Sequence, residues 1–203
     1  MKNNRINKRT TLTGQRGVSM PEVLVAFFVV AIIVVLAMPQ VISSRRASRF
    51  SALQRQVVGA LREAQQEAIS QRTPITFRYD DGDKKIIIYG GSFGAAGTDK
   101  NRSVAIAGED LQPNEILYGR PPGAPVSALA DSANLTSLSA DAVEIVFQAD
   151  GSVVDSDNIP VNKAIFFYHS KNPAQTAFAI SILGAGGRAK IWHYSSTANA
   201  YIE

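Results

Sequence analysis

The sequence contains no cysteine and only two histidines among its 203 residues. The absence of cysteine excludes disulfides, thiol catalysis and cysteine-ligated metal sites. The histidines, His169 and His193, fall on separate expected strands, without a neighbouring nucleophile motif or a metal-ligand spacing such as His-x-x-x-His. We therefore interpret both as residues of strand surfaces, and we expect no catalytic residue, no metal site and no cofactor.

Other motifs of small-molecule sites are also missing. Asp80–Asp83 and Asp155–Asn158 place oxygen ligands close together, as calcium prefers, but neither continues into a twelve-residue EF-hand loop. Both are predicted to be turns. The glycine-rich stretch Gly90–Gly97 lacks the Lys-Ser/Thr of a phosphate-binding loop and does not open a helix, which excludes a nucleotide site. The sequence thus gives no support for an enzyme.

Charge is absent from one long stretch, Val23–Met38, which also lacks polar residues, glycine and proline. As a helix it covers about 24 Å, and extension to Ser19 or Ile42 reaches the ~30 Å of a bilayer core. This length predicts a membrane-spanning helix. Glu22 stands at its leading edge, where a lone carboxylate costs up to about 2.5–3.5 kcal/mol. It therefore needs a partner, and the apolar stretch contains no cation.

The remaining charge is unevenly distributed. Residues 1–17 carry five cations and no acid, whereas residues 18–203 carry 16 cations and 17 acids. Basic residues before an apolar helix stay in the cytoplasm, so the C-terminal part is expected beyond the membrane. Residues 40–72 hold six cations and two acids, and residues 73–203 hold ten cations and fourteen acids. The basic region is either a solvated helix face or a surface for anionic headgroups or acidic faces of neighbouring subunits.

The apolar pattern predicts one helix from Val18 to about Gln71, of about 80 Å if nearly continuous. Pro39 lies inside it and is expected to kink or loosen it. Pro74 disfavours helical geometry at Thr73 and should end the helix. Beyond Pro39, one apolar stripe recurs at steps of three and four residues and should face a folded head; it comprises Phe50, Leu53, Val57, Leu61, Ala64 and Ala68.

After Thr73 the apolar period changes to two, which indicates β-strands. We predict a hairpin over 74–89, short strands at 103–106 and 115–118, a surface loop over 119–140, a second hairpin over 143–154, and strands at 164–168, 177–183 and 188–194. The fold class is α+β, a long helix with two packed antiparallel sheets. The expected domains are 1–17 (leader), 18–42 (transmembrane and assembly helix), 43–72 (amphipathic helix) and 73–203 (β head).

The N-terminal pattern resembles the signal of type IV pilins and type II secretion pseudopilins. In that family a basic leader ends in glycine, a glutamate is the fifth mature residue, and a proline is the twenty-second. Here Gly17, Glu22 and Pro39 match in register, while Val18 replaces the usual Phe or Met. The resemblance implies that prepilin peptidase cuts after Gly17 and methylates the amine of Val18. It also implies that Glu22 pairs with that amine of a neighbouring subunit, which sets the filament register.

Three shorter features resemble the GspH/FimT branch of this family: 61–68 in the helix, Phe147–Gly151 in the second hairpin, and Gly187–Arg188. The resemblance implies a minor pilin or pseudopilin of a type II secretion pseudopilus or type IV pilus. Such a protein is single-pass in the bacterial inner membrane, has a periplasmic head, contacts membrane lipid, and joins a filament of other pilins.

The alternative is a DNA-binding minor pilin for DNA uptake. In FimT-type pilins a Gly-Arg-x-Arg stretch near the C-terminus contacts DNA, and Arg188 and Lys190 occupy the corresponding positions here. Trp192 and Tyr194 could then stack on bases. The excess of acids in residues 73–203 disfavours broad backbone binding. The contrary interpretation of these cations is an edge strand protected from unwanted pairing.

Overall fold

The computed structural model describes residues 19–91, 100–106 and 111–203. The chain divides into two compact units, Met1–Ser43 and Ser44–Glu203. Helix α1 (Met20–Gln71) contributes residues to both units. Because their relative placement is undetermined, each unit is described by itself.

Helix α1 begins and ends where the local sequence favours it. The carbonyl of Ser19 accepts hydrogen bonds from the N–H groups of Glu22 (3.0 Å) and Val23 (3.2 Å), and Pro21 occupies the first turn, where a missing N–H costs little. The backbone remains helical through Pro39. Arg72 has a left-handed φ of 54° and ends the helix, so the predicted end at Gln71 is confirmed.

The predicted apolar stripe of α1 is confirmed. All six of its residues are buried, and the three last ones, Leu61, Ala64 and Ala68, are at most 1% exposed. The arginines at 45, 55 and 62 are exposed on other faces of the helix. The helix is therefore amphipathic where it belongs to the head unit.

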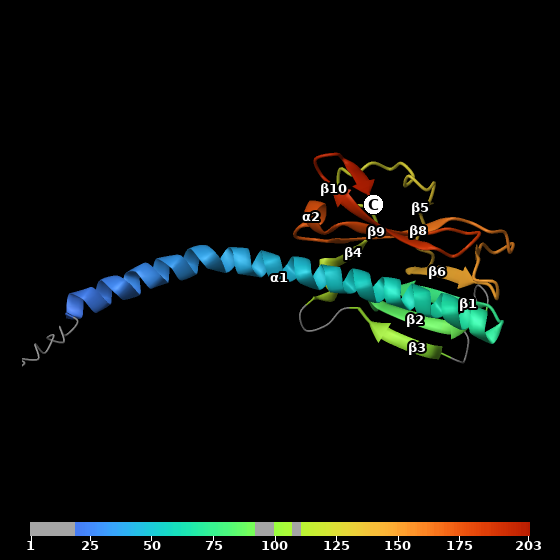
Figure 1. Ribbon diagram of the computed structural model, residues 1–203, viewed down its shortest axis with the longest axis horizontal. Helices are drawn as coiled ribbons and strands as arrows, with labels where there is room; N and C mark the ends of the chain where they lie inside the picture. The colour runs from blue at the N-terminus through green and yellow to red at the C-terminus, as the bar shows by residue number, and fades with distance from the viewer. Residues whose placement is uncertain (1–18, 92–99, 107–110) are drawn as a thin grey trace, which may run out of the picture. The chain divides into compact units, whose positions relative to one another are not determined.

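Two sheets pack against the apolar stripe of α1 (Figure 1). The first has the order β3-β2-β1-β6-β7, and the second has the order β11-β10-β9-β8-β4, with β5 paired in parallel to β8. The first sheet comprises β1 (Ile75–Asp80), β2 (Lys85–Gly90), β3 (Lys100–Ala105), β6 (Ala142–Phe147) and β7 (Val153–Val154). The second comprises β4 (Ile116–Tyr118), β5 (Asn134–Leu135), β8 (Lys163–His169), β9 (Phe178–Ile182), β10 (Ala189–Ser195) and β11 (Ala200–Ile202). The fold class is α+β, as predicted.

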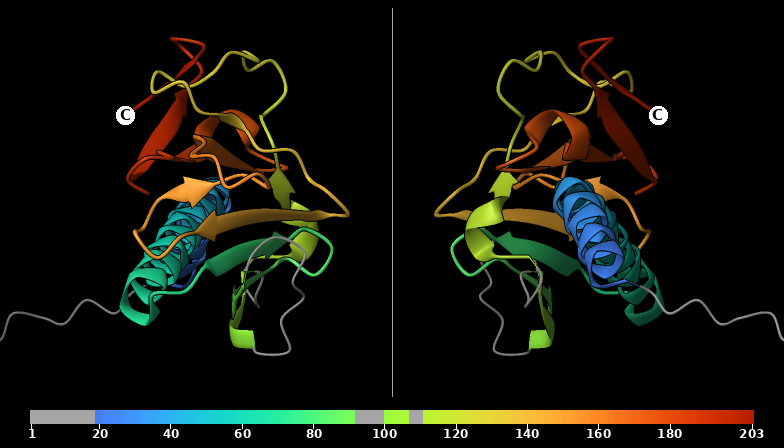
Figure 2. Two further views of the ribbon diagram at one scale, coloured as in Figure 1. Left: turned by 90° about the vertical axis from the view of Figure 1, so that its right-hand side faces the viewer. Right: turned by 90° about the vertical axis from the view of Figure 1, so that its left-hand side faces the viewer.

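The core lies where the helix stripe meets the inner faces of both sheets. The end-on views in Figure 2 show the strands of the two sheets around the helix. Aromatic rings join the sheets there. Phe167 of β8 packs edge-on against Tyr79 of β1 (5.0 Å between centroids) and Tyr118 of β4 (5.5 Å). Aromatic contacts of this kind add stability beyond the area they bury. The head unit thus has a main core between the helix and the two sheets, and a second, smaller hydrophobic cluster contains Phe166, Ala179 and Trp192.

Three details differ from the sequence expectations. Residues 119–140 are not simply a surface loop, because Leu129 and Ala133 are buried and β5 lies within them. Two short elements were not predicted, the helix α2 (Pro173–Thr176) and strand β11. A 3-10 turn, Pro113–Glu115, also precedes β4.

Candidate functional site

The apolar stretch of α1 has the length and composition of a membrane span from Met20 to Met38. None of it is buried within the chain. Its large side chains, such as Phe27 (71% exposed) and Leu36 (74% exposed), all face outward. A surface of this kind needs lipid or other apolar helices around it.

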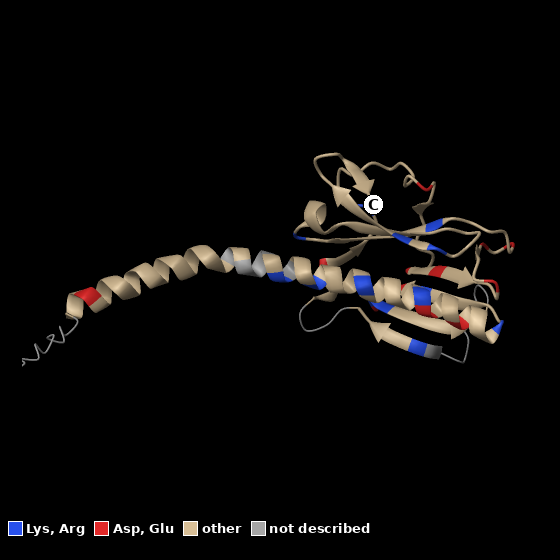
Figure 3. Ribbon diagram, in the orientation of Figure 1, with Lys and Arg blue, Asp and Glu red and all other residues tan. Residues whose placement is uncertain are grey.

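Glu22 is the one charged residue of this segment and lies in the first turn of α1 (Figure 3). Its side chain is exposed. Among the residues that the structure describes, no ion pair or side-chain hydrogen bond involves Glu22. The positive end of the helix dipole favours a carboxylate there, but a cationic partner within this part of the chain is missing. The expected processing residues Gly17 and Val18 lie outside the described residues.

In the head, the three short features that resemble the GspH/FimT branch meet at one point. Gln65 of α1 donates hydrogen bonds from Nε2 to the carbonyls of Gly151 (3.1 Å) and Gly186 (3.1 Å). Gly151 closes the β6–β7 turn, and Gly186 lies in the β9–β10 turn. One amide of the helix therefore links the turns of both sheets.

Two glycines are required by this close approach. A Cβ at Gly187 would lie 2.1 Å from the carbonyl oxygen of Gly151 and 2.3 Å from Nε2 of Gln65. A Cβ at Gly151 would lie 2.9 Å from Cδ1 of Ile69. Both residues also have left-handed φ values, 59° and 82°, which glycine adopts without steric cost. The cluster therefore explains these glycines by packing within the head.

Arg188 and Lys190, the candidate residues for DNA contact, have different surroundings. Arg188 is exposed and lies just before β10. Lys190 donates a hydrogen bond to a carboxylate oxygen of Glu203 at 2.9 Å and lies 5.5 Å from the ring centroid of Trp192. This lysine is thus already engaged by an acid from beyond β11.

The aromatic residues beside them do not form an open stacking platform. Trp192 is 4% exposed and donates from Nε1 to Oγ of Ser181 at 2.8 Å, so the expectation that it could stack on bases is wrong. Tyr194 is half-buried and donates to Oδ1 of Asn199. Among the described strands, the edge-strand expectation is confirmed for Ala189–Trp192, which pair only with β9, whereas Tyr194 and Ser195 pair with β11.

The histidines likewise differ from each other. His193 is exposed, as predicted, but His169 is fully buried at 0% exposure. The ring of His169 packs edge-on against Phe50 of α1, and its Nδ1 accepts a hydrogen bond from the N–H of Lys171. The buried Nε2 of the same ring lies 3.8 Å from Oε2 of Glu115, so the ring is surrounded by Phe50, a backbone N–H and a carboxylate. A structural role for His169 follows.

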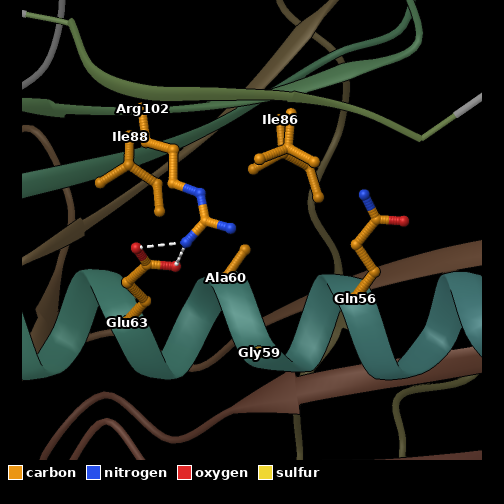
Figure 4. A pocket seen from close by; sticks show the side chains of 8 residues that line it. Gln56, Gly59, Ala60, Glu63, Ile86, Ile88 and Arg102 are labelled. Atoms are coloured by element: carbon orange, nitrogen blue, oxygen red, sulfur yellow. Dashed lines mark hydrogen bonds and ion pairs between the residues drawn. The ribbon is translucent and has the colours of Figure 1, made fainter.

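A groove of about 260 Å³ lies between α1 and strands β2 and β3 (Figure 4). Arg102 of β3 and Glu63 of α1 form an ion pair across it at 2.6 Å. Its floor is made of Ile86 and Ile88, which already belong to the core. Within the described ranges, no group of three or more potential metal-ligating side chains occurs either.

A family model described as "Type II transport protein GspH" matches residues 53–186, which is well over half of the chain. The chain belongs to the GspH family. The description of this family is that of a type II transport protein. The resemblance inferred from the short features in the head is thereby confirmed.

Two crystal structures of the type IV minor pilin FimU from Pseudomonas aeruginosa are similar to this GspH-family chain. The first is 16% identical, with 77% of this chain and 91% of FimU covered and a TM-score of 0.40. The second, in another crystal form, is 19% identical, with 71% and 90% covered and the same TM-score. A comparison with curated proteins gave no match.

Proposed function

We propose that this GspH-family chain is a minor pilin or pseudopilin, anchored in the bacterial inner membrane and assembled into a filament through α1. One observation carries the proposal: an outward-facing apolar helix with a single carboxylate, Glu22, in its first turn. Apolar helices of neighbouring subunits would cover the segment. The excess of cations in residues 1–17 supports a cytoplasmic N-terminus and a periplasmic head.

In this proposal prepilin peptidase cuts between Gly17 and Val18 and methylates the new amine. Cleavage matters because it removes five cations and creates an α-amine four residues before Glu22. An amine and a carboxylate near lipid are each costly alone and much less costly when paired. The amine of a neighbouring subunit would then neutralise Glu22 and fix the axial position of each subunit.

The test is incorporation of a Glu22→Gln variant into filaments of cells that express the full chain. We expect normal membrane insertion, because the change removes a charge from an apolar segment, and an incorporation reduced by about tenfold or more. Glu67→Gln is the matched control, since it makes the same change on the head part of α1. Normal incorporation of Glu22→Gln would contradict the pairing of this carboxylate.

Processing can be followed in the same cells. Mass spectrometry of the mature chain should find Val18 at the N-terminus with one added methyl group. Gly17→Leu should block the cut and keep the chain out of filaments, whereas Gly14→Leu, in the same leader, should be processed normally. A photo-crosslinker at Val25 would then identify the neighbouring subunits, and secretion pseudopilins or a major pilin would distinguish the two machines.

The DNA-uptake alternative retains one supporting observation, the exposed Arg188. Lys190 is held by Glu203, and Trp192 is buried. We therefore favour the structural role over DNA binding.

A further inference from the structure

Among the described strands, β3 is the longest that lies at the edge of a sheet. It has six residues, pairs with β2 on one side, and has no described strand on the other side. The other strands at sheet edges, β4, β5, β7 and β11, have two or three residues each. Natural sheets keep their edges short or covered, because an open edge offers a row of backbone hydrogen-bonding groups to another chain. Strand β3 is therefore the place where another chain can add a strand to the head.

The backbone of β3 turns hydrogen-bonding groups outward at Ser103. The N–H of Ile106 donates to the carbonyl of Lys84 at 3.0 Å, so Ile106 faces β2. In an antiparallel pair, the residues one and three positions before it point their N–H and carbonyl groups the other way. Ser103 and Ala105 therefore face away from β2, and both are exposed. The carbonyl of Ala105 already accepts a hydrogen bond at 3.1 Å from Nε2 of Gln56, a donor outside the sheet.

Arg102 does not protect this edge. Charged side chains on an edge strand commonly prevent pairing with another chain. The guanidinium of Arg102, however, points over the groove towards α1 and pairs with Glu63 at 2.6 Å (Figure 4). The next three residues of β3, at positions 103–105, are uncharged. This part of the edge therefore has no charge of its own that would repel an added strand.

The groove between α1 and strands β2 and β3 lies along the inner side of β3. Val104 lines it together with the apolar side chains of Ile86, Ile88 and Ala60. Its volume is about 260 Å³, whereas an apolar cavity of ~150 Å³ already holds a benzene molecule. The groove therefore has room for one apolar side chain from a strand added to β3.

A polar hollow of about 440 Å³ continues the groove along α1. It shares Glu63 and Arg102 with the groove, and Gln66 and Ser70 also line it. The amide of a glutamine and the hydroxyl of a serine can both donate and accept hydrogen bonds. The surface beside β3 thus changes from apolar to polar, and the ion pair stands between the two parts.

We infer that β3 and this groove form a docking site for an extended segment of a different protein. The segment pairs with β3 at Ser103, places an apolar side chain in the groove and places an uncharged polar side chain in the hollow. In strand addition of this kind, main-chain hydrogen bonds give affinity, and pockets for alternate side chains give specificity. The site goes beyond the proposed function, because it gives the head a partner that does not depend on Glu22.

A second copy of this chain fits the site less well. Every described strand is already paired in its own sheet, so two copies would meet through β3 itself. Gln56 of α1 contacts Ala105, and Glu63 contacts Arg102, so α1 runs antiparallel to β3 in the head. Two antiparallel β3 strands would therefore set the head parts of α1 antiparallel as well. That arrangement conflicts with the anchorage of both copies at the N-terminal end of α1 that we propose.

Binding of synthetic peptides to the purified full chain in detergent tests the inference. The probes are fluorescent peptides of about eight residues, the length of an ordinary strand, in which valine or leucine alternates with threonine or serine. Fluorescence anisotropy should show saturable binding. A central proline, or aspartate in place of the apolar residues, should weaken binding by about tenfold or more. The inference is overturned if no alternating peptide binds saturably, or if these changes in the peptide have no effect.

Ser103→Pro and Ser103→Val form a matched pair of variants in the chain. Proline removes the outward N–H and takes no hydrogen bond from the pairing with β2, whereas valine keeps the N–H and favours a strand. Ser103→Pro should lower the affinity for the peptides by about tenfold or more, and Ser103→Val should bind as the unsubstituted chain does. Thermal unfolding of each variant confirms its fold. Equal affinities of the two folded variants would rule out pairing through β3.

Hydrogen exchange locates the contact in the unsubstituted chain. A bound peptide should slow exchange of the amides at Ser103 and Ala105 by about tenfold or more, because both face outward. The amides of Ala189–Trp192, at the open edge of β10, are the control and should not change. Binding without protection at Ser103 would overturn strand addition.

A disulfide test distinguishes the second copy as occupant. The chain has no cysteine, so Ser103→Cys gives a single thiol at the edge. A disulfide-linked dimer that forms readily on mild oxidation, and that the peptides do not displace, would mean that β3 pairs with itself and would overturn the inference. Because all of these measurements use the purified chain, their outcome is independent of filament incorporation. A chain that enters filaments but binds no peptide keeps the proposed function and loses this docking site, and a chain that binds peptides but enters no filament does the reverse.

Discussion

At the scale of single residues, the close contact of Gly187 with Gly151 and Gln65 leaves no room for a side chain at position 187. Gly187→Ala places a Cβ 2.1 Å from a backbone oxygen that cannot move without shifting the β6–β7 turn. We expect this substitution to lower the free energy of unfolding by about 2–4 kcal/mol. Urea denaturation of residues 44–203, the compact unit that contains the whole core, would measure the loss.

The neighbouring Gly186 is the matched control for that measurement. A Cβ at Gly186 would meet no atom within 4 Å, and its φ is not left-handed. Gly186→Ala should therefore change the free energy of unfolding by no more than about 0.5 kcal/mol. A similar loss from both substitutions would mean that flexibility of the turn, and not the contact with Gln65, decides its stability.

The ion pair between Glu115 and Lys171 predicts how the stability of the head changes with pH. A hydrogen bond from Nζ of Lys171 at 2.8 Å lowers the pKa of this carboxyl below its ordinary value. The ion pair therefore stabilises the head above the ordinary pKa of glutamate, and the stabilisation is lost as pH falls through the lowered pKa. Glu115→Gln should be less stable than the unsubstituted protein at pH 7, and denaturation curves should converge towards pH 3. A difference that persists unchanged at acid pH would contradict the ion pair.

At the scale of the helix, Gly59 lies in the interior of α1, where glycine weakens a helix relative to alanine. Gly59→Ala should raise the free energy of unfolding of residues 44–203 by about 0.5–1 kcal/mol and the Tm by about 2–4 °C. The reason is that alanine restricts the unfolded chain and meets no atom in the fold. Thermal unfolding followed by circular dichroism checks this.

The reverse substitution at an exposed position of the same helix is the control for Gly59→Ala. Ala52→Gly should lower the Tm by a comparable amount, because Ala52 is exposed and makes no core contact. A lower Tm for Gly59→Ala would mean that the added methyl group meets an atom inside the head, which would contradict the open space beside Gly59.

The elements that could be predicted from sequence are those with a sustained period. The six buried residues of α1 follow steps of three and four, and the hairpin β1–β2 alternates around an acidic turn. Strand β11 has three residues and β5 has two, so neither offers enough residues for a period. Buried His169 and Trp192 were misjudged because polar atoms suggest a surface. Each ring is in fact covered: His169 accepts from the N–H of Lys171, and Trp192 donates to Ser181 of the neighbouring strand.

Contacts between distant segments could not be derived from sequence at all. Gln65 lies 86 residues before Gly151 and 121 before Gly186, and only the assembled sheets bring them together. The segments 61–68, Phe147–Gly151 and Gly187–Arg188 were noticed because they resemble the GspH/FimT branch. That resemblance did not predict that the three segments contact one another. Likewise, the processing residues Gly17 and Val18 and the assembly residues Glu22 and Pro39 were recognised by their register, and their roles remain predictions.

At the scale of the whole molecule, the distribution of charge decides how the head should respond to DNA. Residues 73–203 carry ten cations and fourteen acids, so the general attraction of phosphate backbones is absent. Arg188 is exposed, but Lys190 would have to leave Glu203 to reach a phosphate. We expect residues 44–203 to give no retardation of duplex DNA at physiological salt.

At low salt the prediction becomes specific to two side chains. Any retardation there should disappear in Arg188→Ala with Lys190→Ala, and it should increase in Glu203→Gln, because that change releases the ammonium of Lys190. Arg72→Ala, which removes a cation at the end of α1, is the matched control and should leave it unchanged. Strong binding at physiological salt that depends on Arg188 and Lys190 would instead favour the DNA-uptake function, because a net acidic head can hold DNA only through a specific local site.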